Sequence, residues 1–508
     1  MGLITPVLCL VALVSFFLMF VRKLLTPLVP VKGTTNVPGP IGGRRWPIFG
    51  DALWFAGVRD MKGMLDTCRK LARMRNGIIS FWMGSKLVIM IYEATLLKKV
   101  IDSKKCPRKE EEFYSSFAHF TDGVFATNNL TRWSKLRRSL DKFLLPKRMD
   151  DYMEVFTDKA GMTCDYIQKI CGKGVLDVKE IADLYMLNIV LEIFLGIPST
   201  QQFDDSKYLI KLFGRMAPCA LLRAIGPLYK INWIFHSSPL GRETQDIIDS
   251  LKPPFGKIVD DCLKKMKDRG YPRNDFAFEP QNYLEAVIDF EFQQNSSKEK
   301  MMSTIYDVLV AGYDTTGVAI ASAILFLAMH PEYQEKAYQE QLILMGGSLE
   351  APTRTELSKM EYLDMAFNET LRKVMVPGTM RILSSELEID GYVLPEGSTM
   401  FLSLNLIAND PQYWENPDGF YPDHFLPENV AKRPECSFTP FAFGTRGCPG
   451  RRFSLISSKL IISMLLRRFK FTSPLKYNEI THQYGTMVQI VEGYPIEVTP
   501  RPSATTNG

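Results

Sequence analysis

The sequence predicts a mainly α-helical fold with small β-sheets, an α+β architecture. Apolar residues recur at helical spacing through most of residues 130–335 and again after residue 450. Strand-like runs are few and short, and residues 405–450 form a long irregular stretch rich in proline and asparagine. Many helices, few strands and one long loop are typical of a large helical body that carries small sheets.

Length and composition allow a large buried core. The chain has 508 residues, of which 46% are hydrophobic. Length alone suggests about three domains. No internal repeat or low-complexity linker follows residue 50, however, so one large domain is equally compatible. The net charge of +5 is mild and does not indicate a nucleic-acid partner.

The nine cysteines are scattered, form no Cys-x-x-Cys pair and are odd in number. This pattern fits a reducing compartment better than a disulfide framework. No two of the five histidines have the spacing of metal ligands on a helix, so the sequence does not indicate zinc chemistry.

Residues 1–23 predict a membrane anchor. Gly2 to Val21 carry no charge, and a helix of twenty residues spans about 30 Å, which matches a bilayer core. Arg22 and Lys23 follow directly, which places the rest of the chain in the cytosol by the positive-inside rule. A cleaved signal peptide is the alternative, but the basic residues follow the apolar run and no small-residue cleavage site is evident.

Residues 24–50 are predicted to form a hinge, because the prolines and glycines of segment 37–43 would break a helix. A plain linker is a nearly equivalent interpretation. Residues 51–500 are assigned to one catalytic domain and residues 501–508 to a disordered tail.

Few segments of this domain favour strands. Two β-rich runs within Ile78–Tyr92 flank Gly84-Ser85, which predicts a hairpin. Further strands are expected near Arg381–Glu388 and Thr399–Leu404, with a turn at Asp390-Gly391.

Two other segments have an aromatic or apolar character. Residues 113–129 are aromatic without clear periodicity, which favours a loop with some helical turns. Residues 216–236 are strongly apolar and include Trp233 and Phe235. They fit either the core or a surface that dips into a membrane.

A long helix is expected from Met301 to His330, ended by Pro331. Asp314 and Thr315 stand inside its apolar run, where buried polar groups cost stability unless they have partners. A polar patch facing solvent is the alternative, which the apolar flanks disfavour. A second helix is expected over about residues 355–375, and a last one over Phe453–Leu466.

The segment Pro440–Gly450 directly precedes the last helix. Glycine allows its backbone to approach a flat cofactor, and a helix N-terminus stabilises negative charge on the sulfur of Cys448. A buried free cysteine in a turn is the alternative for a lone cysteine.

The spacing of five residues in this segment resembles the haem-binding loop of the cytochrome P450 family. They are Phe441, Gly444, Arg446, Cys448 and Gly450. The resemblance implies a P450 fold with haem b between the long central helix and this loop, and Cys448 as the axial thiolate. Residues 311–316 are similar to the family's oxygen-activation motif, which implies Thr315 as hydrogen-bond donor and Asp314 as proton relay.

Glu369 and Arg372 lie three apart on one helical face, where a surface salt bridge would be worth almost nothing. They resemble the family's Glu-x-x-Arg pair, which implies a structural role. The third partner in the family is usually an arginine, and the matching stretch Pro422–Phe425 has His424 instead. A neutral histidine donates one hydrogen bond and lacks the bidentate fork. The usual proline pair after Arg372 is also missing, which puts the local geometry in doubt.

Four residues are candidates for contacts with the haem propionates by resemblance: Trp133, Arg137, Arg381 and Arg446. Trp133 and Arg137 share a helical face, and propionates require donors or cations. A tryptophan in the core and an exposed arginine are the alternatives for each residue alone.

The resemblance covers nearly the whole chain and is greatest to the clan of fatty-acid ω-hydroxylases and many insect enzymes. It implies a monooxygenase that inserts one oxygen atom from O2 into a lipophilic substrate, such as a fatty acid, terpenoid, steroid or xenobiotic. Electrons would come from NADPH through the P450 reductase, with cytochrome b5 as an optional donor. Some clan members bind haem covalently through a glutamate; Ala311 stands at that position, so no such ester is expected.

The implied location is the endoplasmic reticulum membrane, with one N-terminal anchor and a cytosolic catalytic domain. Basic residues within 135–148 and 451–468 form either a solvated face or a docking surface for the acidic electron donor. Substrate contacts are expected from segments 113–125 and 216–236, from the start of the long helix and from Val376–Met380. An oxygen-independent haem-thiolate isomerase or dehydratase, and a non-catalytic haem- or lipid-binding protein, are the alternatives.

Overall fold

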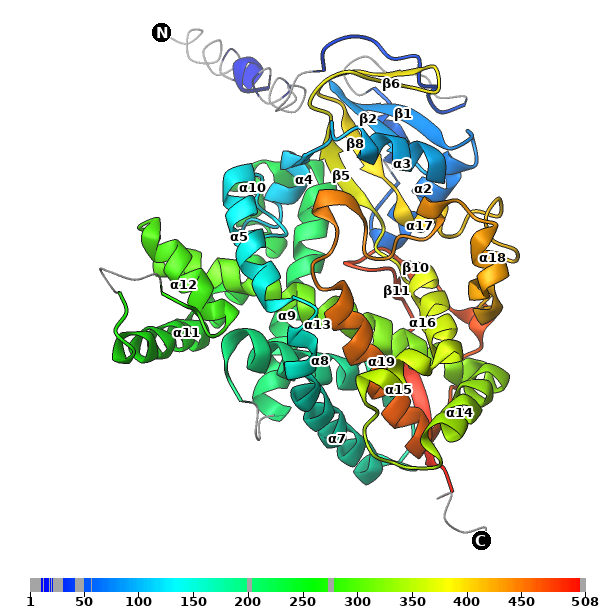
Figure 1. The fold of residues 1–508 in the computed structure, drawn as a ribbon. Coiled ribbons are helices and arrows are strands. Elements are labelled where there is room, and N and C mark those ends of the chain that lie inside the picture. Colours follow the sequence, from blue (N-terminus) through cyan, green and yellow to red (C-terminus); the bar gives the residue numbers. More distant parts are fainter. Residues whose placement is uncertain are drawn as a thin grey trace. The chain divides into compact units, whose positions relative to one another are not determined.

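The computed structural model describes residues 11, 13–17, 19, 21, 31–41, 50–55, 57–198, 203–272 and 278–502. Most of the predicted anchor, much of the predicted hinge and residues 503–508 of the predicted tail lie outside these residues. Figure 1 draws these residues as a ribbon. The chain divides into two compact units. Unit 1 comprises Met1–Glu112, Gly378–Ile407 and Pro434–Ser437, and unit 2 comprises Phe113–Pro377, Ala408–Arg433 and Phe438–Gly508.

Unit 1 is built on a sheet with the strand order β1-β2-β8-β5-β3. β1 and β2 form the predicted hairpin, and Gly84 adopts a φ of +64° in its turn. β8 runs parallel to β2, with Val88 opposite Thr399, whereas the other pairs are antiparallel. The strands are β1 (Ile78–Met83), β2 (Lys86–Ile91), β3 (Arg108–Lys109), β5 (Thr379–Ile382) and β8 (Thr399–Leu402).

Short elements complete unit 1. A second hairpin, β6–β7, turns at Asp390-Gly391 as predicted. The strand predicted near Thr399–Leu404 is β8. The segment Arg381–Glu388 contains the end of β5 and the start of β6 instead of one continuous strand. The remaining elements are η1 (Ala52–Phe55), α2 (Met61–Ala72), α3 (Ala94–Asp102), β6 (Leu387–Ile389), β7 (Tyr392–Leu394), α17 (Leu404–Ile407) and η4 (Glu435–Ser437). α4 (Glu111–Ser115) begins in unit 1 and ends in unit 2.

Unit 2 is mainly helical, so the mainly α fold with small sheets is confirmed. Its helices are α5 (Leu130–Phe143), α6 (Arg148–Asp151), α7 (Met153–Ile170), α8 (Val178–Leu195), α9 (Phe203–Ile225), η2 (Pro227–Lys230), α10 (Asn232–Ser237), α11 (Pro239–Asp268), α12 (Tyr283–Gln293), α13 (Lys298–Met329), α14 (Pro331–Met345), α15 (Arg354–Lys359), α16 (Glu361–Lys373), η3 (Pro422–Phe425), α18 (Pro427–Ala431), η5 (Gly444–Arg446), α19 (Arg451–Arg468) and η6 (Tyr477–Glu479). Its two small sheets have the orders β4-β12-β9 and β10-β11, formed by β4 (Leu176–Asp177), β9 (Phe469–Thr472), β10 (His482–Gln483), β11 (Gln489–Ile490) and β12 (Pro495–Pro500).

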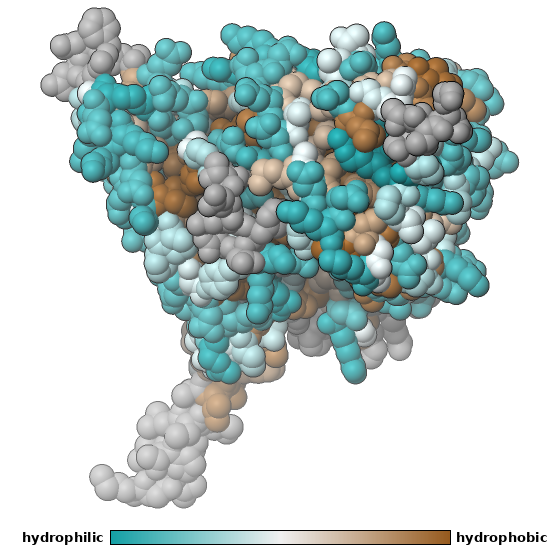
Figure 2. Space-filling view, turned by 90° about the horizontal axis from the view of Figure 1, so that it is seen from below, coloured by the Kyte–Doolittle hydropathy of each residue, from teal (hydrophilic) through white to brown (hydrophobic). Residues whose placement is uncertain are grey.

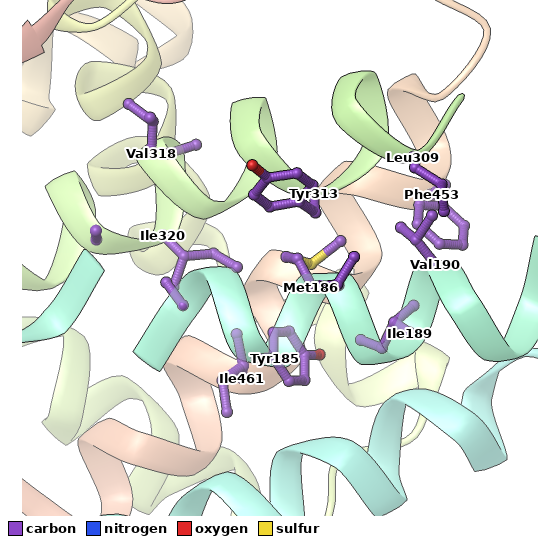
Figure 3. Packing of buried hydrophobic residues seen from close by; sticks show 14 of the residues in the cluster. Tyr185, Met186, Ile189, Val190, Leu309, Tyr313, Val318, Ile320, Phe453 and Ile461 are labelled. Carbon is purple, nitrogen blue, oxygen red and sulfur yellow. The ribbon is translucent and has the colours of Figure 1, made fainter. Parts of the chain in front are cut away.

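The core of unit 2 lies around α13, which packs against α8 and α19 (Figure 3). Figure 3 draws Met186 and Val190 of α8, Tyr313 of α13 and Phe453 of α19 in this core, and the ring centroids of Phe453 and Phe194 of α8 are 5.4 Å apart. Two glycines of α13 allow this close approach. A Cβ on Gly312 would lie 3.0 Å from Val190, and a Cβ on Gly317 would lie 2.1 Å from the Asp183 carboxylate.

Among the described residues, α13 is the one helix long and apolar enough to cross a membrane, but 72% of its most apolar segment is buried inside the protein. The described residues within 11–21 are helical, and their large apolar side chains are exposed except for that of Val21, which is half-buried. On the face drawn in Figure 2, hydrophilic residues predominate and hydrophobic residues form separate patches.

Of the two helices predicted over residues 301–330 and 355–375, the structure confirms the first and divides the second. The long helix is nearly as predicted and ends just before Pro331, which opens α14. A single helix over 355–375 is wrong, because the chain breaks at Met360 between α15 and α16. The Glu340 carboxylate accepts hydrogen bonds from the backbone of Tyr362 at 2.6 Å and of Leu363 at 3.1 Å. A residue of α14 thus caps the start of α16.

Candidate functional site

Residues 438–450, here called the Cys448 loop, fold back directly before α19. The backbone N–H of Cys448 donates to the Phe441 carbonyl at 2.8 Å, and that of Gly447 donates to the Gly444 carbonyl at 3.0 Å. Gly444 has a φ of +71°, a conformation that glycine adopts without steric cost. The Ser454 N–H then donates to the Gly450 carbonyl at 2.8 Å as α19 begins. These bonds fix Cys448 at the helix N-terminus.

Cys448 is the exposed one among the eight described cysteines. Its side chain is reachable by solvent although protein atoms surround it closely. This crowding raises the pKa of the Cys448 thiol by desolvation, whereas a hydrogen bond from the Gly450 N–H and the charge of Arg137 lower it. The sulfur therefore lies in a recess and already has a hydrogen-bond donor and a nearby cation, which suit a thiolate.

Three predicted propionate contacts lie at this loop. Arg137 of α5 donates from Nη1 to the Gly447 carbonyl at 2.9 Å and from Nε to Asp141 at 2.8 Å. The Arg446 guanidinium lies 3.7 Å from the ring centroid of Trp133, which also belongs to α5. The structure thus brings Trp133, Arg137 and Arg446 together beside Cys448. The fourth candidate, Arg381, lies in unit 1 on β5, opposite Met400 of β8.

An accessible strip interrupts the otherwise buried middle of α13. Ala311 is exposed and Thr315 is half-buried, although the residues that flank this segment are buried. Positions four apart lie on one helical face, and the Thr315 hydroxyl donates to the Ala311 carbonyl at 2.8 Å. The next residue, Thr316, donates to the Ser454 hydroxyl at 3.2 Å and so ties α13 to the start of α19.

Asp314 is buried and belongs to a polar network rather than to this strip. One carboxylate oxygen accepts from Lys179 of α8 at 3.4 Å, and the other accepts from the hydroxyl of Thr486. Lys179 also donates to Asp183 at 2.5 Å. Lys179, Asp183 and Thr486 were not predicted from the sequence. The four-residue spacing of Lys179 and Asp183 within an apolar helix is the signal that could have identified this pair.

The charges in this network affect one another. Burial raises the pKa of Asp183 to about 7; the ammonium of Lys179 opposes this shift and the nearby Asp314 adds to it. Burial lowers the pKa of Lys179, but the two carboxylates more than offset that effect, so its pKa is raised. Lys179 therefore remains charged while Asp183 titrates near neutral pH.

Glu369 and Arg372 form a fully buried bidentate pair in α16. Arg372 donates to the two carboxylate oxygens from Nε at 2.8 Å and from Nη2 at 2.7 Å. It also donates to the backbone carbonyls of Ala408 and Pro417, at 3.0 Å and 2.9 Å, and of Gly419 at 2.9 Å. The pair therefore fixes the course of residues 408–419.

His424 lies in η3 against this pair, where the sequence departs from the family pattern. Its Nδ1 is 3.2 Å from each Glu369 carboxylate oxygen, and its Nε2 is 2.5 Å from the Glu415 carbonyl. Both ring nitrogens thus face oxygen atoms. Burial alone raises the pKa of Glu369, but Arg372, with a smaller contribution from His424, lowers it below its ordinary value.

These residues fit a haem. The accessible thiol of Cys448 supplies the soft ligand that such iron takes, and the cations of Arg137 and Arg446 lie beside it as partners for carboxylates. The accessible strip of α13 carries the small side chains of Ala311 and Thr315. The hydrogen bond from Thr316 to Ser454 connects α13 to α19, which directly follows the Cys448 loop.

The chain belongs to the cytochrome P450 family, because the family described as "Cytochrome P450" matches residues 40–494. It is similar to cytochrome P450 4c3 of Drosophila melanogaster, with 24% identity over 488 residues, 93% of this chain and 90% of that protein. It is also similar to cytochrome P450 4c21 of Blattella germanica, with 23% identity over 437 residues, 85% of this chain and 87% of that protein. Cytochrome P450 3A6 of Oryctolagus cuniculus is 26% identical over 462 residues, 86% of each chain.

These similarities confirm the predicted family, enzyme class and cofactor. The protein is a haem-thiolate monooxygenase that uses haem b with a cysteine thiolate ligand. The similarity to cytochromes P450 4c3 and 4c21 also supports the predicted relation to insect enzymes.

Proposed function

We propose that the protein inserts one oxygen atom from O2 into a lipophilic substrate, with Cys448 as the thiolate ligand and electrons from NADPH delivered by a reductase. The observation that carries this proposal is the environment of Cys448. An accessible sulfur accepts a hydrogen bond from Gly450 and lies at a helix N-terminus beside Arg137. Haem bound at this sulfur supplies the oxygen-activation chemistry, and the chain supplies the ligand, the proton path and the pocket.

The residues of the Cys448 loop and α5 would bind the cofactor's carboxylates. Arg137 and Arg446 carry the cations, and Trp133 holds the Arg446 guanidinium by a cation–π contact. We also propose that Arg381 binds a carboxylate of the cofactor. Phe441 and Gly444 fix the backbone of the loop, and Gly450 donates to the sulfur.

Asp314 and Thr315 would deliver protons. The Thr315 hydroxyl lies at the accessible strip, where it can hold a water or the reacting oxygen after it releases the Ala311 carbonyl. Asp314 directly precedes Thr315 in α13, and its carboxylate accepts hydrogen bonds from Lys179 and Thr486. Asp183, which titrates near neutral pH, lies next to Asp314 in this network, because the Lys179 ammonium donates to both carboxylates. Glu369, Arg372 and His424 would support the site without contacting reactants.

Exposed residues indicate how the enzyme would contact a membrane and its electron donor. We propose that the exposed apolar residues within 11–21 belong to an anchor in the endoplasmic reticulum membrane. Exposed basic residues of α5 and α19 would bind an acidic reductase: Lys135, Arg138, Lys142, Arg451 and Arg452. Arg467 is a poor candidate for this surface, because it is buried and donates to the Ser348 and Glu350 carbonyls.

Isotope labelling tests this proposal. Full-length protein would be incubated with ¹⁸O₂, NADPH, a P450 reductase and a set of lipophiles. We expect a product with one ¹⁸O atom from the wild type, less product from Thr315→Ala, and a recovered yield from Thr315→Ser. Because loss of one hydrogen bond costs about 1 kcal/mol, Thr315→Ala should lower the rate of product formation roughly fivefold. Oxygen-independent conversion of the lipophiles would instead support an isomerase or dehydratase.

A further inference from the structure

Two of the segments expected to contact substrate meet around Arg223. His119 of segment 113–125 stacks on Phe235 of α10, with ring centroids 5.6 Å apart and an interplanar angle of 15°. His119 also lies edge-on to His236 at 5.9 Å. From α9, the Arg223 guanidinium lies 3.9 Å from the Phe235 ring centroid. These residues are called the Arg223 site below.

Arg223 is buried without an opposing charge. Its exposed fraction is 8%, and its Nη2 donates to the Asn232 side chain at 3.0 Å. Its Nη1 is buried and has no hydrogen-bond partner among the described residues. No carboxylate in the described part of the chain forms an ion pair with it. Burial lowers the pKa of Arg223, but a guanidinium remains protonated in proteins. A buried cation of this kind costs free energy until an anion reaches it.

The neighbouring His119 does not neutralise the charge of Arg223. Burial, with added contributions from the charges of Arg223 and His236, lowers the pKa of His119 to about 4. His119 is therefore neutral at neutral pH and can donate one hydrogen bond without adding positive charge. The surroundings are otherwise aromatic, since Tyr229 lies 6.2 Å from Phe235. Buried Phe117 and Phe120 flank His119 in its own segment.

We infer that Arg223, with His119 beside it, binds the carboxylate of a lipophilic substrate. A carboxylate would satisfy Nη1 and neutralise the guanidinium, and the aromatic residues would contact the apolar chain. This inference rests on the proposed function, because it takes segments 113–125 and 216–236 as walls of the substrate pocket. It narrows the substrate class from lipophiles in general to anionic ones.

Another arginine of α9 provides a control. The side chain of Arg215 is 50% exposed and is paired with Glu243 at 2.7 Å. An exposed ion pair of this kind contributes little to the stability of the fold. Arg215→Met therefore removes a charge from the same helix without touching the Arg223 site.

Equilibrium dialysis tests the inference without turnover. Radiolabelled dodecanoic acid and its methyl ester would be dialysed against full-length holoenzyme in detergent. Because a hydrogen bond to a charged group is worth about 1.5–3 kcal/mol, Arg223→Met should weaken binding of the acid about tenfold or more and leave binding of the ester unchanged. Arg223→Lys should recover part of the affinity, and Arg215→Met should have no effect. Equal affinity of the wild type for acid and ester, or an equal loss of both in Arg223→Met, would overturn the inference.

A phospholipid headgroup is the other source of an oxyanion. Co-sedimentation with phosphatidylcholine vesicles, with and without phosphatidylserine, separates the two sources. If Arg223→Met reduces binding to anionic vesicles but not to dodecanoic acid, the site serves the membrane and the substrate assignment is wrong. Because dialysis needs no catalysis, a wild type that binds the acid but forms no ¹⁸O product would contradict the proposed function and leave this inference standing.

Discussion

At the residue scale, the most strongly constrained side chains are those that support the site. Each of the three guanidinium nitrogens of Arg372 donates to an oxygen, and His424 continues this network to the Glu415 carbonyl. The sequence predicted the pair and flagged the histidine. It did not predict how His424 takes part, because that depends on η3 placing the ring between Glu369 and a backbone carbonyl.

Arg372→Met would leave the Glu369 carboxylate buried with only His424 and a backbone N–H as partners. Breaking a buried ion pair in this way costs about 3–5 kcal/mol, so the free energy of unfolding and the bound haem content should both fall clearly. Thermal denaturation and haem absorbance would measure this. The control is Arg354→Met, which removes an exposed partner of Asp150 and should cost less than about 1 kcal/mol. Similar losses in both variants would contradict the structural role.

Asp183 predicts a pH dependence of stability. Its folded-state pKa of about 7 exceeds the ordinary value of 3.8, so the folded protein binds this proton more tightly than the unfolded chain. The group therefore stabilises the fold most below its unfolded pKa, and this contribution is lost as the pH rises towards 7. Asp183→Asn should remove this loss, so its melting temperature should rise relative to wild type between about pH 4 and pH 7. A constant difference across this range would show that Asp183 does not titrate there.

At the element scale, the contact of α8 with α13 positions the proposed proton path. Gly317 lets the Asp183 carboxylate lie against the backbone of α13. The sequence predicted α13 closely, because a long apolar run ends at a proline. It missed the break at Met360, because the cap of α16 comes from Glu340 in another helix. It also missed the partners of Asp314, which come from α8 and from residue 486.

Gly317→Ala would place a Cβ 2.1 Å from Asp183 Oδ1, so α8 and α13 would have to separate. Overpacking of this kind costs about 1–3 kcal/mol. The matched control is Gly161→Ala in α7, where a Cβ would meet nothing within 4 Å. Replacing a helical glycine by alanine should stabilise by about 0.5–1 kcal/mol. Chemical denaturation of both variants would test this, and opposite signs are expected.

At the scale of the whole molecule, the sequence predicted the fold class, the family and the cofactor. The order of the motifs along the chain carried that prediction, and the family match over residues 40–494 confirms it. Two features could not be predicted from local pattern. The two compact units are assembled from segments far apart in the sequence, and the Arg223 site combines side chains from α9, α10 and segment 113–125.

The thiolate role of Cys448 is the central claim, and the absorption spectrum of the reduced, carbon-monoxide-bound protein tests it most directly. The wild type should show the red-shifted Soret band of thiolate ligation. The control variant Cys171→Ala should show it too, because it changes a half-buried cysteine that is hydrogen-bonded to the Val498 carbonyl. Cys448→Ala should lose this band, and Cys448→His, checked for folding by circular dichroism, should bind haem without it. A wild type that lacks the band, or a Cys448→Ala variant that keeps it, would contradict the account.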